Sequence, residues 1–249
     1  MKLPTKNPLA KIGHRRTGGL RCKPNFTKSL LLLLGACLVT GLSVPARAAD
    51  TATVTFSLEF PNSDPERYSI SVSSDGHAKY ECSAKVAPES DERQSYESAF
   101  EFSPANRERI FALTAQAHYF AGKIDSGNHK LAFTGAKKLV YRDGERSSIA
   151  DYNYSSLPAV QQLTALFQSV ASTLEYGRRL AYYHRYQKLA LDEELKRMEG
   201  QARSNELSEL HAVEPLLQAI SSDPSVMNVV RARAQWLIEL GKKDASGGR

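Results

Sequence analysis

Cysteine is scarce in this chain. Only three occur in 249 residues, and Cys22 and Cys37 lie within the first 48 positions, which leaves Cys82. A single cysteine forms no internal disulfide even in an oxidising compartment. The 201 residues from Ala49 onward must therefore be stabilised by burial, and that length suffices for one large or two small cores. Cys82 lies on the apolar side of an alternating segment, so we interpret it as a small buried hydrophobe.

Acidic residues are absent from positions 1–48. These positions hold nine lysines and arginines and one apolar run of about 15 residues, from Leu30 to Val44. A basic start, a short apolar run and small residues at Ala46 and Ala48 are typical of a secretory signal. The sequence predicts a cleavable signal peptide over residues 1–48, cut between Ala48 and Ala49, and an exported protein that is periplasmic or secreted.

Two other fates of this segment stay open. The apolar run is shorter than the ~20 residues of a spanning helix, yet an uncleaved signal would act as a membrane anchor. Leu34-Gly35-Ala36-Cys37 resembles a lipidation box, although apolar residues continue past Cys37. Membrane association is expected only through one of these two routes. Arg15-Arg16 does not indicate a twin-arginine signal, because the apolar run starts well downstream of it.

Positive charge is also scarce once this leader is set aside. Nine of the 33 lysines and arginines, and none of the 27 acidic residues, belong to residues 1–48, so 24 basic and 27 acidic residues follow. The expected mature chain has a net charge of −3. Because this balance lacks the basic footprint of a nucleic-acid-binding protein, no nucleic-acid partner is expected.

Motifs that carry catalysis or hold cofactors are missing. Zinc motifs such as HExxH, serine-hydrolase motifs such as GxSxG and phosphate-binding glycine loops do not occur. Residues 133–138 contain one glycine and are interpreted as a turn between strands. A loop separates His118 from His129, and we interpret each as a solvated or core-edge histidine, with a pair that meets across the loop as the alternative. We expect no cofactor and no metal, and a non-enzymatic protein. The alternative is a hydrolase of cell-wall or extracellular polymer with a dispersed site of nucleophile, base and orienting acid.

Residues 49–155 follow a period of two, which is the pattern of strands with one buried face. The expected strands cover residues 52–60, 68–72, 78–84, 96–102, 131–141 and 147–154. A helix interrupts them, with Ser103 as its N-cap and Pro104 at its first position. Its apolar stripe consists of Ile110, Leu113, Thr114 and Ala117. This part of the chain is therefore expected to form an α+β sheet domain.

The turn between the second and third strands can be predicted in detail. A two-residue loop would oppose Val72 to Lys79 and place a charge on the apolar face. A three-residue loop, Ser74-Asp75-Gly76, opposes Val72 to Ala78 instead and keeps that face apolar, and burial of one face selects the register. Gly76 provides the positive φ that this loop requires.

After Pro158 the apolar residues recur every three or four positions, which predicts a helical region over residues 156–240. Only Gly177 interrupts this pattern before Gly200, at a cost of about 1 kcal/mol relative to alanine, so one long helix is expected. The fold class is therefore α+β. An antiparallel, strand-rich N-terminal half with one helix precedes a helical C-terminal half with one long helix.

Prolines mark the last two helices. Pro215 opens a short one, and Asp223-Pro224 opens the final helix, with Met227 on its apolar face and Gly241 after its end. Residues 241–249 are polar and glycine-rich, which predicts a disordered tail.

Four segments resemble a group of uncharacterised exported bacterial proteins. They are FTGAKKLVY from Phe133, DYNYS from Asp151, AVQQLTALFQSV from Ala159 and EYGRRLAYYHRYQKLALDEELKRM from Glu175. The resemblance spans roughly residues 55–240. It implies export and a shared fold, and it implies no activity and no site residue.

One stretch of the expected long helix interleaves tyrosines with cations. Tyrosine rings stacked with guanidinium groups bind anionic polymers, sugars or other proteins. The predicted binding residues are Tyr176, Arg178, Arg179, Tyr182, Tyr183, Arg185 and Tyr186. We expect the helical half to bind another macromolecule through them, either another envelope protein or an anionic polymer.

Packing is the competing interpretation of the same stretch. Tyrosines and arginines of one helix often cover an adjoining sheet, with rings and stems packed and polar ends in water. The acidic run Asp192-Glu193-Glu194 is also expected to pair with Arg185 and Lys188 at helical spacing. Burial and ionic partners of the individual side chains distinguish the two interpretations.

Overall fold

The computed structural model describes residues 51–87, 90–128 and 130–245, which belong to one compact unit. The predicted signal peptide, its cleavage site at Ala48 and Ala49, Cys37 and His129 lie outside the described residues. Among the described helices, none combines the length and apolar character that a membrane span requires.

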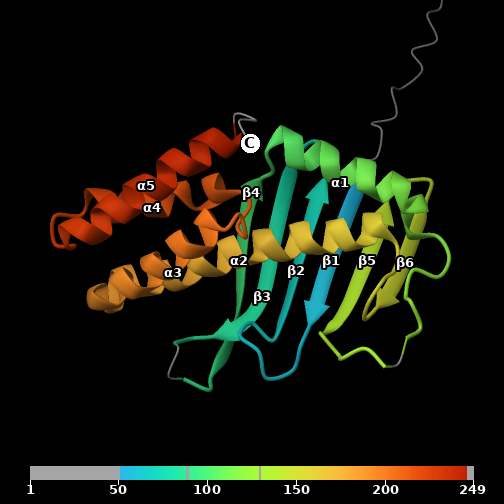
Figure 1. Ribbon diagram of the computed structural model, residues 1–249, viewed down its shortest axis with the longest axis horizontal. Helices are drawn as coiled ribbons and strands as arrows, with labels where there is room; N and C mark the ends of the chain where they lie inside the picture. Colours follow the sequence, from blue (N-terminus) through green and yellow to red (C-terminus); the bar gives the residue numbers. More distant parts are fainter. Residues whose placement is uncertain (1–50, 88–89, 129, 246–249) are drawn as a thin grey trace, which may run out of the picture. The chain divides into compact units, whose positions relative to one another are not determined.

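Six strands form one antiparallel sheet (Figure 1). They are β1 (Thr53–Glu59), β2 (Arg67–Ser73), β3 (His77–Lys85), β4 (Arg93–Glu101), β5 (Ala136–Arg142) and β6 (Ser147–Tyr152). Their order across the sheet is β4-β3-β2-β1-β5-β6. Alternation sends Val54 and Phe56 of β1, and Ile70 of β2, to one fully buried face. The predicted α+β class is confirmed.

The predicted turn between β2 and β3 is confirmed. Val72 lies opposite Ala78, Ile70 opposite Tyr80 and Tyr68 opposite Cys82. Gly76 has a φ of +104°, as the three-residue loop requires.

The strand predicted over residues 131–141 is wrong in its first part, because β5 begins at Ala136. The preceding residues form a loop in which Gly135 has a φ of +100°. Asn153 Oδ1 accepts a hydrogen bond from Thr134 N at 3.0 Å. This contact with a residue distant in sequence takes the place of the backbone hydrogen bonds that a longer β5 would make with a neighbouring strand.

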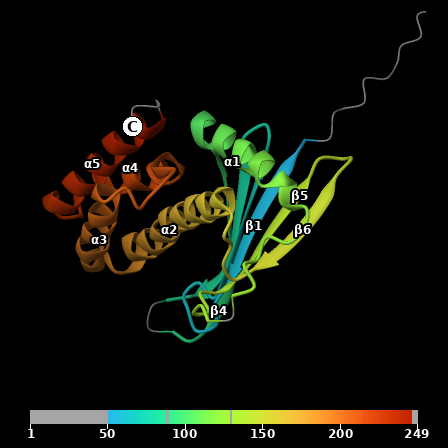
Figure 2. The ribbon, with the colours of Figure 1, turned by 45° about the vertical axis from the view of Figure 1, so that its right-hand side comes forward.

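In the described part of the chain, five α-helices accompany the sheet. They are α1 (Pro104–Gln116), α2 (Pro158–Tyr186), α3 (Leu191–Arg203), α4 (Glu214–Ser222) and α5 (Asn228–Ala245). Figures 1 and 2 show α1 and α2 on the same face of the sheet, with α3, α4 and α5 gathered beside the C-terminal part of α2. Ser103 caps α1 and Pro104 opens it, as predicted.

One hydrophobic core joins the sheet to all five helices. Phe56 of β1 stacks on Phe167 of α2 with ring centroids 5.4 Å apart. The same cluster continues through Leu180 of α2 to Leu195 of α3 and Leu237 of α5. The sheet and the helices are therefore layers around one core.

The single long helix predicted from Pro158 to Gly200 is wrong. α2 ends at Tyr186, Gln187 takes a φ of −144°, and α3 starts at Leu191 after a 3-10 turn. α3 packs against both α2 and α5. Burial of Leu191, at 0% exposure, in this packing outweighs the uninterrupted helical pattern.

The predicted bounds of the last helix are also wrong. α5 begins at Asn228, Met227 is 44% exposed, and Gly241 lies inside the helix. A Cβ on Gly241 would lie 3.1 Å from Leu210 Cβ, so this glycine permits close packing of α5 on the 3-10 turn Leu210–Val213. Residues 242–245 of the predicted disordered tail are helical, and residues 246–249 lie outside the described part.

Candidate functional site

One side of α2 lines a row of neighbouring hollows. Its core-facing stripe includes Leu163, Phe167 and Val170, which are fully buried. The neighbouring stripe runs from Gln161 to Tyr186 and lines four adjoining hollows. At 1.5 Å per residue this stripe extends about 38 Å. The amphipathic spacing that buries one face of α2 thus aligns the other along these hollows.

The four hollows share lining residues. The first, of about 440 Å³, contains Lys137 and shares Gln168 with the second, of about 390 Å³. The second shares Arg179 with the third, of about 290 Å³. The third shares Tyr182 with the fourth, of about 370 Å³. Because neighbouring hollows share lining residues, they lie side by side along α2, and we call this row of four hollows the α2 groove.

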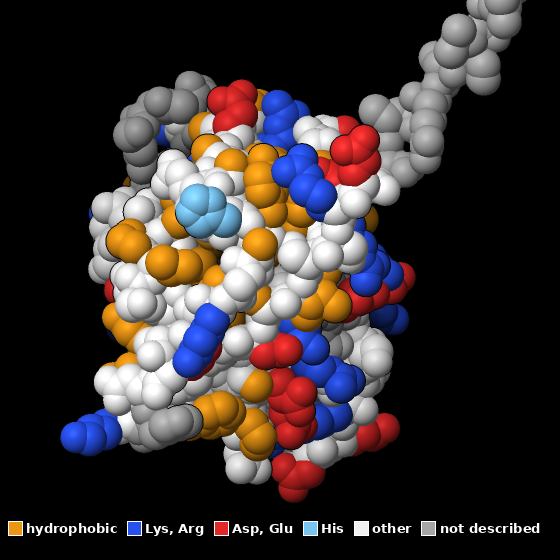
Figure 3. All heavy atoms as spheres, turned by 90° about the vertical axis from the view of Figure 1, so that its right-hand side faces the viewer, with side chains coloured by type: hydrophobic (Ala, Val, Ile, Leu, Met, Phe, Trp, Pro, Cys, Tyr) orange, Lys and Arg blue, Asp and Glu red, His pale blue; other side chains and the backbone are white. Residues whose placement is uncertain are grey.

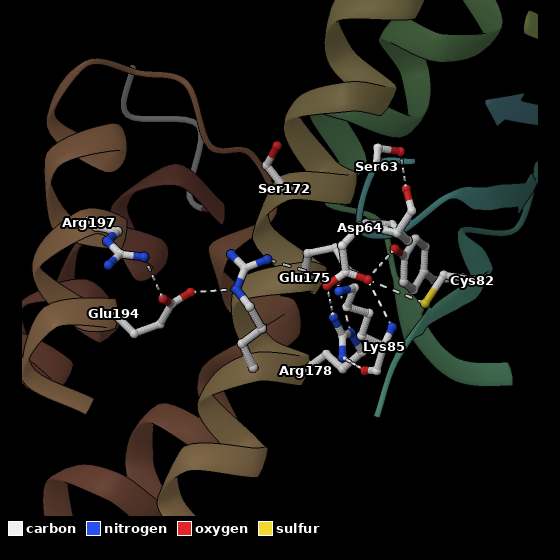
Figure 4. Close-up of polar contacts among 12 residues, drawn as sticks. Ser63, Asp64, Cys82, Lys85, Ser172, Glu175, Arg178, Glu194 and Arg197 are labelled. Carbon is white, nitrogen blue, oxygen red and sulfur yellow. Dashed lines mark hydrogen bonds and ion pairs between the residues drawn. The ribbon is translucent and has the colours of Figure 1, made fainter. Parts of the chain in front are cut away.

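A buried carboxylate organises the middle of the α2 groove (Figure 4). Glu175 is 4% exposed. Its Oε1 accepts a hydrogen bond from the Tyr80 hydroxyl at 2.6 Å, and its Oε2 accepts one from Arg178 Nε at 2.9 Å. Cys82 Sγ lies 3.4 Å from Oε1. Burial, followed by the Glu175 charge, raises the pKa of the Cys82 thiol to about 12, so this thiol is protonated at neutral pH.

Arg178 joins α2 to the sheet. Besides Glu175, it donates to the Lys85 carbonyl oxygen at 3.0 Å and to Asp64 Oδ2 at 3.4 Å. Asp64 also accepts from the Lys85 backbone N–H at 2.9 Å. Arg178 is therefore a structural cross-link whose side chain is 13% exposed.

Arg179 joins α2 to α3. Its Nε donates to Glu194 Oε1 at 2.6 Å, and Arg197 Nη1 lies 3.6 Å from Glu194 Oε2 (Figure 4). Its guanidinium lies 4.8 Å from the centroid of the Tyr176 ring. The Arg179 side chain is 27% exposed, so it faces the groove while it fixes α3.

The structure divides the predicted tyrosine–arginine set between packing and surface. Tyr176 is buried at 5% exposure, and Tyr183 packs against the core. Tyr182 contacts the rings of Tyr183 and Tyr186, at 5.8 and 5.2 Å between centroids. Tyr186 is 62% exposed, and Arg185 lies over its ring at 5.2 Å. Tyr182, Arg185 and Tyr186 thus form the accessible C-terminal end of the groove.

The predicted pairing of the acidic run with Arg185 and Lys188 is wrong. Because α3 turns back, Asp192 pairs with Arg233, Glu193 with Arg197 and Glu194 with Arg179. Lys188 instead contacts Asp223 at 2.6 Å.

Cations outnumber carboxylates in the α2 groove. The lining cations are Lys85, Lys137, Arg178, Arg179, Arg185 and Arg197. The lining carboxylates are Asp64, Glu175 and Glu194. A further hollow, of about 490 Å³ on the helix-free sheet face, has the opposite balance, with Arg67 against Glu81 and Glu97. The lining of the groove therefore has an excess of cations, on a chain whose residues after 48 carry net negative charge. Lys85 and Arg197 also pair with Asp91 and Glu193, which lie outside the lining.

A cluster around Asp223 contains the residue types of a serine hydrolase. Asp223 accepts from His184 Nε2 at 2.9 Å and from the Ser225 hydroxyl at 2.6 Å. The carboxylate thus stands between histidine and serine, whereas a triad needs the histidine in the middle. Hydrogen bonds from Lys188 and then Ser225 hold the pKa of Asp223 well below its usual range. This cluster fastens the end of α2 to the segment before α5.

Sequence reasoning missed the residues of the groove's opposite wall. Lys137 alternates with Leu139 and Tyr141 in β5, and that alternation is a signal that the lysine shares their buried face. Asp64 and Glu194 carry no such signal, because chain reversals bring them to α2. In the part of the chain that is described, no three His, Cys, Asp or Glu side chains are grouped to hold a metal.

No protein-family model matches this chain, and a search of curated proteins gave no match.

Proposed function

We propose that the protein is exported to the cell envelope or secreted, and that it binds an anionic polymer in the α2 groove without enzymatic activity. The observation that carries this proposal is the row of neighbouring hollows along α2, which six cations and three carboxylates line. Positive charge confined to a groove focuses the field and attracts an anionic chain. A strip of about 38 Å accommodates several repeating units at once.

Blocking the groove tests this proposal. Gln168 lines both of the first two hollows, so the larger side chain of Gln168→Trp should block the groove at their boundary. We expect labelled oligogalacturonate and poly-L-glutamate, used as polyanion probes in fluorescence anisotropy, to bind the unaltered protein. Gln168→Trp should weaken binding at least tenfold. Gln162→Trp is the matched control, because Gln162 is exposed on the same helix and contacts Arg109 instead.

Two outcomes of this assay would contradict the proposal. Absence of binding to both probes would overturn the proposal, and so would a Gln168→Trp variant that binds as the unaltered protein does. Arg185→Ala provides a charge test, since Arg185 is exposed at the end of the groove. Its effect should shrink as salt rises and screens the contact.

The export part of the proposal rests on the pattern of residues 1–48. Protein recovered from the envelope or medium of the expressing bacterium should have an intact mass that starts at Ala49. A mass that starts at Cys37 with attached lipid, or a full-length mass in the membrane, would replace free export with an anchored form.

A further inference from the structure

The first hollow of the α2 groove contains a buried cation without a counter-charge. Lys137 is 5% exposed. Its Nζ donates to the Thr134 hydroxyl at 2.8 Å and to the carbonyl oxygens of Asn153, Thr134 and Gly135 at 3.0, 3.2 and 3.3 Å. All four oxygens are neutral. Burial lowers the pKa of Lys137, and no carboxylate among the described residues acts on it.

A buried charge that only neutral groups solvate is costly. The other buried charged side chains in the groove have ionic partners, as Glu175 has Arg178 and Glu194 has Arg179. Lys137 instead lines a hollow of about 440 Å³. A carboxylate that enters the hollow would replace one of these neutral acceptors and provide the ionic partner that Lys137 lacks.

The remaining lining offers hydrogen bonds suited to a sugar. The Tyr154 hydroxyl accepts from Gln161 Nε2 at 2.9 Å, and it donates its own proton to no described residue. The Gln168 side-chain amide has no hydrogen-bond partner in the described part of the chain, and it borders the same hollow. A hydroxyl donor and an amide that both donates and accepts match the hydroxyl groups of a sugar ring.

Tyr154 lines this hollow, Phe60 lines the second hollow, and Phe133 precedes Thr134, which lines both. Tyr154 is 46% exposed, Phe133 is 55% exposed and Phe60 is 40% exposed. The Phe60 and Phe133 rings contact each other, with centroids 6.0 Å apart. Figure 3 shows the end of the molecule beyond β6, where apolar side chains lie exposed among polar surface. Exposed rings of this kind provide flat apolar area with a polar rim, onto which the C–H face of a sugar stacks.

We propose that the Lys137 hollow receives a carboxylate-bearing sugar unit, so that the polymer bound by the groove is an acidic polysaccharide. This inference rests on the proposed function of the groove. It predicts selectivity for the charged sugar over its neutral ester, with Lys137 as the residue that provides it.

The experiment compares oligogalacturonate with its methyl ester by fluorescence anisotropy. The unaltered protein should bind the acid at least tenfold more tightly than the ester. Lys137→Met keeps an apolar stem and removes the charge, so the ratio of the two affinities should fall below that of the unaltered protein, while the other groove cations keep part of the preference for the acid. Lys138→Met is the matched control, since Lys138 is the exposed neighbour on the other face of β5, and its ratio should stay unchanged.

Two further measurements decide the case if Lys137→Met does not fold. The pKa of Lys137, followed by NMR of its Cε in the unaltered protein, should rise when the acid binds and not when the ester binds. Tyr154→Phe should weaken binding of the acid and of the ester by the same factor, because it removes a hydrogen-bond donor to the sugar and no charge.

The outcomes separate this inference from the proposed function. Binding of the acid with the ratio unchanged in Lys137→Met, or with no change in the Lys137 pKa, overturns the Lys137 site and leaves the groove proposal standing. Poly-L-glutamate bound as tightly as oligogalacturonate overturns the sugar class. If the protein binds neither oligogalacturonate nor poly-L-glutamate, both proposals are overturned.

Discussion

Gly76 takes a φ of +104°, a conformation that side chains with a Cβ rarely adopt. A Cβ there would meet Arg107 at 3.5 Å, which is ordinary contact, so any cost of substitution comes from the backbone. Asparagine tolerates positive φ better than a β-branched residue does. We expect Gly76→Val to lower the thermal unfolding midpoint more than Gly76→Asn. Equal losses would contradict the assigned role of the turn.

Burial of the Cys82 thiol makes the free energy of unfolding decrease at alkaline pH. Its folded pKa of about 12 lies above its ordinary value of 9.0, so the folded protein keeps a proton that the unfolded chain loses. The resulting stabilisation is complete below pH 9 and is lost as pH rises from 9 to 12. We expect about 1 kcal/mol of loss from this thiol between pH 8 and pH 10.

Urea unfolding at these two pH values measures the effect. Cys82→Ala removes the titrating thiol and should lose less stability than the unaltered protein over the same interval. An identical loss in both proteins would show that the thiol of Cys82 does not contribute to the pH dependence.

Helix α2 contains a glycine that its own helical propensity disfavours. A Cβ on Gly177 would lie 2.6 Å from Val213 Cγ1, and Val213 is itself buried. Alanine normally stabilises a helix interior by about 1 kcal/mol relative to glycine. At Gly177 we expect the reverse, a loss of about 1–3 kcal/mol from overpacking, measured by urea unfolding.

Gly200 is the matched control for this prediction. It lies in α3, and a Cβ there would meet nothing within 4 Å. Gly200→Ala should therefore stabilise the protein, by up to about 1 kcal/mol. A stabilising Gly177→Ala would mean that the 3-10 turn carrying Val213 moves away without cost.

At the scale of the whole molecule, buried carboxylates connect segments far apart in sequence. Glu209, 3% exposed, accepts from the Ser103 backbone N–H at 2.8 Å and from the Ser103 hydroxyl at 2.7 Å, so it helps to cap α1. Glu175 connects α2 to Tyr80 of β3. With one core beneath them, these contacts make the sheet and the helices stabilise each other.

This shared core predicts one cooperative unfolding transition. Fluorescence of Trp236 in α5 reports the C-terminal helices, and the NMR amide signals of β1 report the sheet. Both should lose their native values at the same urea midpoint. Two separated midpoints would show instead that residues 49–155 and 156–240 unfold as independent domains.

The sequence by itself determined the features that short-range chemistry controls. Alternation and one glycine were enough for the register of the β2–β3 turn, because burial of one face excludes every other pairing. Ser103 and Pro104 marked the start of α1, because capping requires only neighbouring residues.

Only the tertiary structure decided where α2 ends and which charges meet. Residues 158–200 read as one helix, and the break at Gln187 lets Leu191 become buried as α3 packs against α2 and α5. That reversal brings Glu194 to Arg179, whereas local spacing had paired the acidic run with the end of the same helix. The groove depends on such contacts between distant segments, and a periodic pattern contains no information about which segments meet.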